Sequence, residues 1–337
     1  YYNASFYIYT GDVNEDIIDG IWSGLYNVIA NINALIEGLE KSKDLLHPTI
    51  YAMSMAEAYS LRAFIYLDLV RLFSYGNLAQ RPEKWKELAI PYVKRFDKEI
   101  VPRETLENVL KFIHEDLDVA VPLFEAYDPA SRTGSRPEDY TVPNEDHFYD
   151  WNVRKYRMNL KSTLATQMRL NLWEGNYAEA KKDALYLLNL GHSFVTRMEG
   201  EDKDRDLTFS TEMLFGVEPF ERFDKVIVPY FTLTEKNNAT MNYQALYLSE
   251  SRVNELYEIS ANIGISDWRY LRWWDRSDKN HTFLKFWEYE NMVYKNNMPL
   301  IKWPEVYYTV CECLLREGGE KNKNQVITYL NTIRNHR

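Results

Sequence analysis

The stretch 56–76, AEAYSLRAFIYLDLVRLFSYG, constrains most strongly how this chain can fold. Apolar residues fill nearly all of it, which predicts a long helix that other helices cover on most sides. Gly76 is expected to end that helix. At about 100° per residue, four polar side chains share one narrow stripe that we expect to face solvent: Glu57, Ser60, Asp68 and Arg71. Arg62 projects from the packed side, and because a buried guanidinium is costly alone, we expect a neighbouring helix to supply a carboxylate partner.

The residues before this stretch predict its first packing partner. Between positions 17 and 40, apolar residues recur at alternating spacings of four and three, which is typical of one helical seam. We expect this segment to form an antiparallel helical hairpin with 56–76 across a turn near Pro48. Trp22 lies on the seam and is therefore expected in the core.

Three later segments also carry helical patterns. Apolar spacing predicts a helix over 105–124, and 160–190 predicts two helices around Gly175, in a Gly-Asn-Tyr turn typical of a tetratricopeptide-type unit. The segment 302–336 repeats that arrangement. The chain is therefore predicted to be all-α, mainly helical, with helix pairs that bury one another's faces and a loop-rich irregular half. Little sheet is expected over 191–234.

Two motifs resemble those of a known family. LRAFIYLDLVRLF, within 56–76, looks like the signature helix of the SusD/RagB family, the glycan-capturing lipoproteins of Bacteroidetes outer membranes. A second family signature is matched by 298–337, which opens MPLIKWPEVYYTVCECLLREGG and closes YLNTIRNHR. The chain departs from the family pattern at Lys302, where the family has arginine, and at Pro304, where it has alanine. Proline is tolerated there because it falls in the first turn of a helix.

The resemblance implies an organisation for the whole chain, namely a single SusD-like domain over 1–337. Helical repeat pairs are expected near 17–74, 105–190 and 302–336, and loop-rich insertions near 77–102, 125–157 and 191–300. The family is anchored through an N-terminal acylated cysteine and continues beyond the second signature. The resemblance therefore implies that an N-terminal anchor and a C-terminal tail are missing from this chain.

The function that the resemblance implies is non-catalytic binding of an oligosaccharide or polysaccharide at the outer cell surface, without a cofactor. The ligand would be delivered to a SusC-like TonB-dependent transporter. The implied location is the cell outer membrane, as an outward-facing lipoprotein that meets the membrane only through its lipid anchor. Two other classes stay open from the residues alone. One is a helical glycoside hydrolase, because 50 carboxylates could supply an acid pair, and the other is a tetratricopeptide scaffold that binds a peptide or protein.

Composition and motifs argue against several further classes. A net charge of −10 without a run of basic residues disfavours nucleic acid and anionic membrane surfaces as partners. No apolar run approaches the roughly 18 residues of a membrane-spanning helix, and no nucleotide-binding loop, zinc-protease motif or serine-hydrolase motif occurs. Cys311 and Cys313 point apart on one helix, so we interpret them as small buried hydrophobes and expect no metal site. His114 and Asp118, one turn apart, are interpreted as a solvated pair.

The aromatic content of 15% favours carbohydrate binding, in which ring faces stack on sugars and polar groups bond the hydroxyls. Loop aromatics are the better candidates because helices of a repeat scaffold pack their rings against each other. The predicted ligand-binding residues are Trp85, Trp273, Trp274, Asn77, Arg81 and Asp275, with the tryptophan rings in water. The alternative for the adjacent tryptophans is that one packs in the core and the other covers a loop. The alternative site is the 125–157 loop, with Tyr140, Tyr149 and Trp151.

Three local expectations concern the segment that contains the tryptophan pair. Ser249 is expected to cap a helix over 249–259. The sequence Asp-Trp-Arg-Tyr at 267–270 is expected to form a structural turn. Lys285 and Phe286 are expected to lie in a packed strand.

Overall fold

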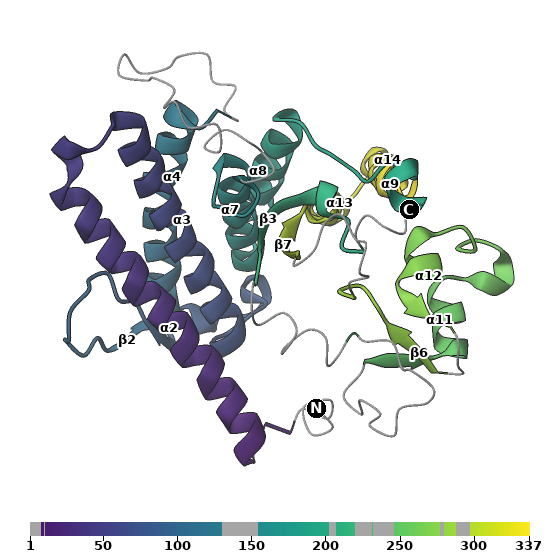
Figure 1. Ribbon diagram of the computed structural model, residues 1–337, viewed down its shortest axis with the longest axis horizontal. Coiled ribbons are helices and arrows are strands. Elements are labelled where there is room, and N and C mark those ends of the chain that lie inside the picture. The colour runs from purple at the N-terminus through teal and green to yellow at the C-terminus, as the bar shows by residue number, and fades with distance from the viewer. Residues whose placement is uncertain are drawn as a thin grey trace. The chain divides into compact units, whose positions relative to one another are not determined.

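The computed structural model describes residues 8–9, 11–129, 154–201, 207–219, 231, 246–276, 280–287 and 297–337. The chain forms two compact units. The first comprises 1–150 and 158–186, and the second comprises 151–157 and 187–337. Helices make up most of the described part of both units (Figure 1). The prediction of a mainly helical, all-α chain is therefore confirmed. The single SusD-like domain stays a prediction.

A long helical hairpin opens the first unit. Helix α2 (Asp12–Lys41) and helix α3 (Pro48–Phe73) are joined through a short 3-10 helix, η1 (Lys43–Leu45), and lie side by side in Figure 1. Helix α3 begins at Pro48 because proline fits the first turn, and the His47 ring nitrogen Nδ1 accepts a hydrogen bond from the backbone of Thr49. The predicted hairpin is therefore confirmed.

Helices α4 (Leu106–Tyr127) and α7 (Leu160–Glu174) complete the cover of α3. Gly175, with φ of 87°, ends α7 in the left-handed conformation and turns the chain into α8 (Tyr177–Asn189). The predicted helix–turn–helix is thus confirmed. Helix α8 begins in the first unit and its last turn belongs to the second.

Arg62 is held in a buried polar cluster between α2, α3 and α4. Its Nε and Nη2 donate to the two carboxylate oxygens of Asp116 at 2.7 and 2.6 Å, and its Nη1 donates to Asn33 at 2.8 Å. The hydroxyl of Tyr92 also donates to Asp116, at 2.6 Å. The expected acid partner is thereby identified as Asp116. Because every partner comes from a different segment, the cluster fixes the mutual register of these helices.

Two expectations for the 56–76 helix are wrong. Ser60 does not face solvent: it is fully buried, and its hydroxyl lies 2.6 Å from that of Thr163, because α7 covers this face of α3. Helix α3 also ends at Phe73 rather than at Gly76. Gly76 is required for another reason, since a Cβ at this position would lie 2.9 Å from the Trp173 ring.

Phe73 helps to explain the position of Trp22. The two rings meet edge to face, with 5.0 Å between their centres, and Trp22 is half-buried. This packing agrees with a core role for Trp22.

Short elements connect α3 to α4. The 3-10 helices η2 (Leu78–Gln80) and η3 (Pro82–Lys86) are followed by strand β1 (Leu88–Pro91), which pairs antiparallel with β2 (Arg103–Thr105). Thr105 then caps α4 by accepting a hydrogen bond from the backbone of Asn108 at 3.3 Å.

The second unit is built on a two-stranded sheet and a helical hairpin. Strand β3 (Met213–Val217) pairs antiparallel with β7 (Met298–Lys302), which leads directly into α13 (Trp303–Glu317) and α14 (Glu320–Arg334). Sequence reasoning missed β7. Helix α9 (Arg197–Glu201) and the 3-10 helix η4 (Ser210–Glu212) precede β3. The predicted hairpin over 302–336 is confirmed, with Pro304 in the first turn of α13.

Buried side chains hold this hairpin to its surroundings. Phe194, Tyr307 and Ile333 form one apolar cluster. Cys311 and Cys313 are both buried in α13 and form no disulfide bond, as predicted, and burial raises the pKa of the Cys311 thiol.

Candidate functional site

A small sheet and two short helices of the second unit surround a hollow. The elements are β4 (Tyr247–Ser249), α11 (Glu250–Leu256), η5 (Ile259–Ala261), α12 (Trp268–Arg272), β5 (Trp274–Asp275) and β6 (Asn280–Phe283). The three strands are antiparallel in the order β4-β6-β5, so the register places Tyr247 beside Thr282 and Trp274 beside Phe283. Rings from both edges of the sheet are thereby brought together.

The turn at 267–270 is confirmed as the start of α12. Asp267 caps this helix by accepting from the backbone N–H of Arg269 at 2.8 Å, and it also receives two bonds from the Arg269 guanidinium. Trp268 is buried against Gly200, where a Cβ would lie 2.1 Å from the indole ring. These contacts fix α12 and hence the tryptophan pair that follows it.

The other two local expectations are wrong. Ser249 precedes α11 but makes no capping bond; its hydroxyl pairs with that of Ser251 at 3.1 Å, and the helix ends early, at Leu256. Lys285 and Phe286 lie in a turn after β6, not in a strand, because the chain leaves the sheet at Phe283.

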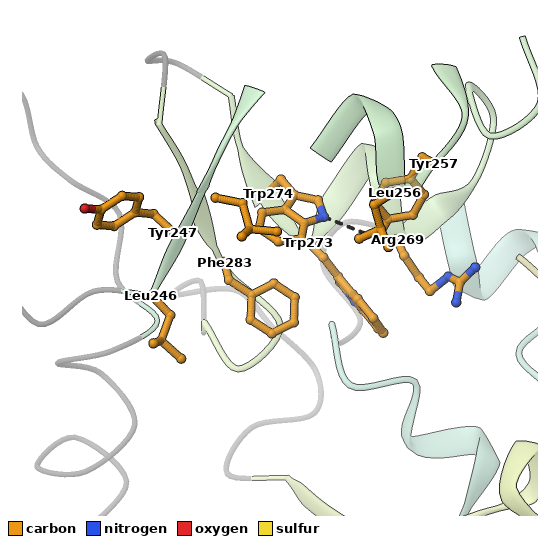
Figure 2. Close-up of a pocket in the computed structure, with 9 residues that line it drawn as sticks. Leu246, Tyr247, Leu256, Tyr257, Arg269, Trp273, Trp274 and Phe283 are labelled. Atoms are coloured by element: carbon orange, nitrogen blue, oxygen red, sulfur yellow. Dashed lines mark hydrogen bonds between the residues drawn. The ribbon is translucent and has the colours of Figure 1, made fainter. Parts of the chain in front are cut away.

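The hollow has a volume of about 540 Å³ and an aromatic lining. Its wall is formed by Tyr247, Tyr257, Arg269, Trp273, Trp274 and Phe283, supplemented by three leucines at 246, 248 and 256. Figure 2 shows Trp274 in the middle of this group, and the centres of the Trp274 and Phe283 rings lie 4.9 Å apart. Tyr247 is 61% exposed and so presents its ring to solvent at the rim.

Few polar groups border the hollow, and each has a defined role. Trp274 Nε1 donates to the Tyr257 hydroxyl at 3.2 Å, which leaves the Tyr257 O–H to donate elsewhere. Burial raises the pKa of Tyr257, so the phenol keeps its proton at neutral pH. The Nε and Nη2 groups of Arg269 donate hydrogen bonds to Asp267, at 3.0 and 2.6 Å. The Cζ atom of Arg269 lies 5.9 Å from the centre of the Tyr257 ring. The hollow therefore offers stacking surfaces beside a hydroxyl and a guanidinium.

A second hollow, of about 280 Å³, shares Leu256, Tyr257 and Arg269 with the first. Its remaining polar lining comprises Glu258, Ser266, Asp267, Arg334 and Arg337. Glu258 has φ of 51°, a left-handed conformation that is uncommon for residues other than glycine. An aromatic hollow and a polar hollow thus adjoin each other at Tyr257 and Arg269.

The expected exposure of the tryptophan pair is wrong in part. Trp274 is only 8% exposed and packs against Phe283, and Trp273 is half-buried with its Nε1 donating to the backbone of Leu207 at 2.6 Å. Behind Trp273, Lys285 Nζ lies 5.3 Å from the ring centre, and burial together with the charge of Lys302 lowers the pKa of Lys285 to about 8. Both tryptophans nevertheless line the aromatic hollow.

The other predicted residues lie elsewhere. Asp275 follows Trp274 in β5 but is not in the lining of either hollow. Trp85, half-buried in η3, and the exposed Asn77 and Arg81 belong to the first unit. Arg81 makes a long bond of 3.4 Å to the Gly76 carbonyl. The alternative candidates fall outside the described residues: Tyr140, Tyr149 and Trp151.

Sequence reasoning missed Tyr247, Tyr257 and Arg269 as lining residues. They come from three separate segments, and only the strand pairing and the fold of α11 onto α12 bring them to the tryptophan pair. Tyr247 carried a weak signal, because it stands in the short apolar run Ala-Leu-Tyr-Leu at 245–248, which is consistent with a strand.

The interpretation of His114 and Asp118 as a solvated pair is also wrong. His114 Nε2 lies 3.0 Å from both carboxylate oxygens of Glu174, which α7 brings against α4. Burial lowers the pKa of His114, but the bond to Glu174 and the nearby charges of Glu174 and Asp118 outweigh it, so the pKa is raised. Across the described ranges, which omit 130–153 and 220–230 among others, no three metal-binding side chains gather.

Comparison with known proteins agrees with this architecture. Residues 2–129 match a SusD-like family model whose description is "starch-binding associating with outer membrane". A crystal structure of a putative sugar binding protein from Bacteroides vulgatus is 20% identical, with a TM-score of 0.68 over 97% of this chain and 65% of that one. This chain has the SusD-like fold. The predicted resemblance to SusD-like proteins is thereby confirmed for the fold.

Two further SusD-like structures support the same conclusion about the fold. A SusD superfamily protein from Bacteroides thetaiotaomicron is 20% identical, with a TM-score of 0.65 over 94% of this chain and 66% of that one. A SusD-like carbohydrate binding protein from Bacteroides vulgatus is 18% identical, with a TM-score of 0.65 over 94% and 61%. The chain therefore spans slightly less than two thirds of the length of these SusD-like structures. No curated protein matches its sequence.

One finding bears on membrane association. Within the described ranges, the helices of this SusD-like chain are too short or too polar to cross a bilayer.

Proposed function

We propose that this chain binds an oligosaccharide without transforming it, and that the aromatic hollow is its binding site. The observation that carries the proposal is the lining of Tyr247, Trp273, Trp274 and Phe283 beside the Tyr257 hydroxyl and the Arg269 guanidinium. Ring faces cover the apolar faces of a sugar, and the polar pair restores hydrogen bonds that sugar hydroxyls give up on leaving water. The SusD-like fold and the family description, which names starch, support a carbohydrate as the ligand.

Binding without catalysis is favoured by the chemistry of the lining. Glycoside hydrolysis uses two carboxyl groups that flank the scissile bond. The described lining of the aromatic hollow contains no carboxylate; the neighbouring hollow holds Glu258 and Asp267, and Asp267 is paired with Arg269. A helical glycosidase would instead release reducing ends, so incubation with the bound oligosaccharide and assay for new reducing ends tests this part.

The partner and the location that we propose follow from the family. The ligand is handed to a SusC-like TonB-dependent transporter, and the protein acts as an outward-facing lipoprotein of the outer membrane. Co-purification from native outer membranes, with the transporter identified by mass spectrometry, tests both. Recovery of the protein without any such barrel would contradict the partnership.

Substitution of an exposed ring tests the site itself. Tyr247→Ala should weaken oligosaccharide binding about tenfold with an unchanged melting temperature, because the ring is exposed and contributes little to the core. Phe96→Ala, which removes an exposed ring from the first unit, is the matched control and should leave affinity unchanged. Affinities are measured by calorimetric titration with the tightest ligand of a glycan array.

Trp85→Ala distinguishes the two groups of predicted residues. Loss of affinity in Trp85→Ala with retention in Tyr247→Ala would move the site to the first unit, beside Asn77 and Arg81. Peptides that compete with the oligosaccharide would favour a protein-interaction scaffold instead.

A further inference from the structure

The polar hollow differs in charge from the molecule that contains it. The chain as a whole carries a net charge of −10. Three arginines nevertheless line this one hollow, namely Arg269, Arg334 and Arg337, against two carboxylates, Glu258 and Asp267. Three positive and two negative side chains leave a local charge of +1.

The partners of each arginine show where that excess lies. Arg269 is neutralised by Asp267 through two hydrogen bonds. Arg337 donates to both carboxylate oxygens of Glu212, from Nη1 at 2.5 Å and from Nη2 at 3.0 Å, and Lys302 Nζ also lies 3.1 Å from this buried acid. Arg334, at the end of α14, is exposed and forms no ion pair with any residue that the structure describes. Among the three arginines of this hollow, the positive charge without an ion pair in the described part of the chain is therefore that of Arg334.

The geometry joins this charge to the aromatic hollow. Tyr257 and Arg269 line both hollows, so a chain molecule that stacks on the rings of the first can extend past them into the second. A guanidinium with unused N–H groups presents a planar donor pair that matches the two oxygens of a carboxylate or two oxygens of a sulfate. An acidic protein repels an anionic ligand over most of its surface, so such a ligand needs a locally positive site.

We propose that the preferred ligand is an acidic oligosaccharide, whose carboxylate or sulfate group occupies the polar hollow while neighbouring sugar rings occupy the aromatic one. This inference rests on the proposed function and specifies its ligand class. Arg334 is the residue that contacts the anionic group, and Arg337 adds to the field. Glu258, in the same lining, weakens the attraction.

The test compares each acidic oligosaccharide with a neutral counterpart of the same backbone. An array carries uronic-acid oligosaccharides beside their methyl esters, and sulfated oligosaccharides beside their desulfated forms. The ligand pair with the tightest acidic member is then titrated by calorimetry. We expect the acidic member to bind about tenfold more tightly at low salt and the difference to shrink at high salt. The comparison of the uronic-acid oligosaccharides with the sulfated oligosaccharides identifies which anionic group the polar hollow binds.

Three variants assign the effect to residues. Arg334→Gln should weaken binding of the acidic member about fivefold and leave the neutral member unchanged, because it removes one exposed charge. Glu258→Gln should have the opposite effect on the acidic member alone. Lys321→Gln, which removes a cation from the first turn of α14 outside the hollow, is the matched control and should alter neither.

The outcomes separate this inference from the proposed function. If neutral and acidic members bind equally, or if Arg334→Gln weakens both alike, the preference for acidic ligands is refuted while oligosaccharide binding stands. If no oligosaccharide binds, both proposals are refuted.

Discussion

Arg62 is the residue on which the first unit most depends. Removal of one member of a buried, hydrogen-bonded ion pair leaves the other charge without compensation, at a cost of about 3–5 kcal/mol. Arg62→Met should therefore lower the free energy of unfolding by about that amount, as measured by urea denaturation. Arg71→Ala removes a partly exposed arginine paired with Asp68 and is the control, with an expected change within about 1 kcal/mol. Equal effects of the two substitutions would contradict the structural role of the cluster.

His114 makes a prediction about pH. Its folded-state pKa is raised above the ordinary value of 6.5 through Glu174, so the protonated ring stabilises the fold. This contribution is fully present below about pH 6.5 and is lost as the pH rises through the folded-state pKa. The wild-type protein should thus lose more stability between pH 6 and 8, by about a few tenths of a kcal/mol or more, than His114→Gln. Parallel pH profiles of the two proteins, from denaturant midpoints, would refute the role of this pair.

Single residues also show what could and could not be predicted from the sequence. The burial of Arg62 and its need for an acidic partner could be predicted from helical periodicity, because successive side chains of a helix project at fixed angles of about 100°. Asp116 could not be chosen in advance, since its position depends on how α4 packs against α3. For the same reason Trp274 was expected in water: its burial comes from Phe283 on the neighbouring strand, which no local pattern reveals.

At the scale of elements, α2 offers a test of helix propensity. Gly20, Gly24 and Gly38 lie inside this helix, and a Cβ at each would meet no atom within 4 Å. Alanine is favoured over glycine in a helix interior by about 1 kcal/mol. Each Gly→Ala substitution should therefore raise the free energy of unfolding by about 0.5–1 kcal/mol, measured by urea denaturation.

Gly175 provides the opposite case. Its φ is 87°, and a Cβ there would lie 2.6 Å from that of Ala79. Gly175→Ala should thus destabilise the protein by about 1–3 kcal/mol. A stabilising effect at Gly175, or a loss of stability at Gly38, would show that these backbone positions are wrongly placed.

Elements with long, regular periodicity were predicted well, whereas most strands were not. Several turns of regular apolar spacing occur in each of the helices α2, α3, α4, α7 and α8. Each of these helices could therefore be predicted from its own residues alone. Strand β7 is five residues long and pairs with β3, some eighty residues away in the chain, so its apolar run could equally begin a helix. The aromatic hollow depends on β4, β5 and β6, which are shorter still. Of the residues that line this hollow, only the adjacent Trp273 and Trp274 were predicted from the sequence.

At the scale of the whole molecule, the two compact units predict separate opening. Arg62→Met disrupts contacts that lie entirely within the first unit. Amide hydrogen exchange should accordingly rise in α2, α3 and α4 of this variant and stay unchanged in α13 and α14, because local stability follows local contacts. Faster exchange in both units to the same extent would instead indicate one cooperative domain, as the resemblance to the SusD/RagB family implies.

The two cysteines turn helix α13 into a natural reporter. The chain has no other thiols, and both lie buried in one helix, where the raised pKa of Cys311 further suppresses its thiolate. A thiol reagent can react with them only when α13 separates from its neighbours. The rate of labelling in native buffer therefore measures how often this hairpin opens, without any engineered probe. The labelling rate can be measured with and without a saturating oligosaccharide. A slower rate with the ligand would show that binding at the hollows reduces the opening of α13 and α14.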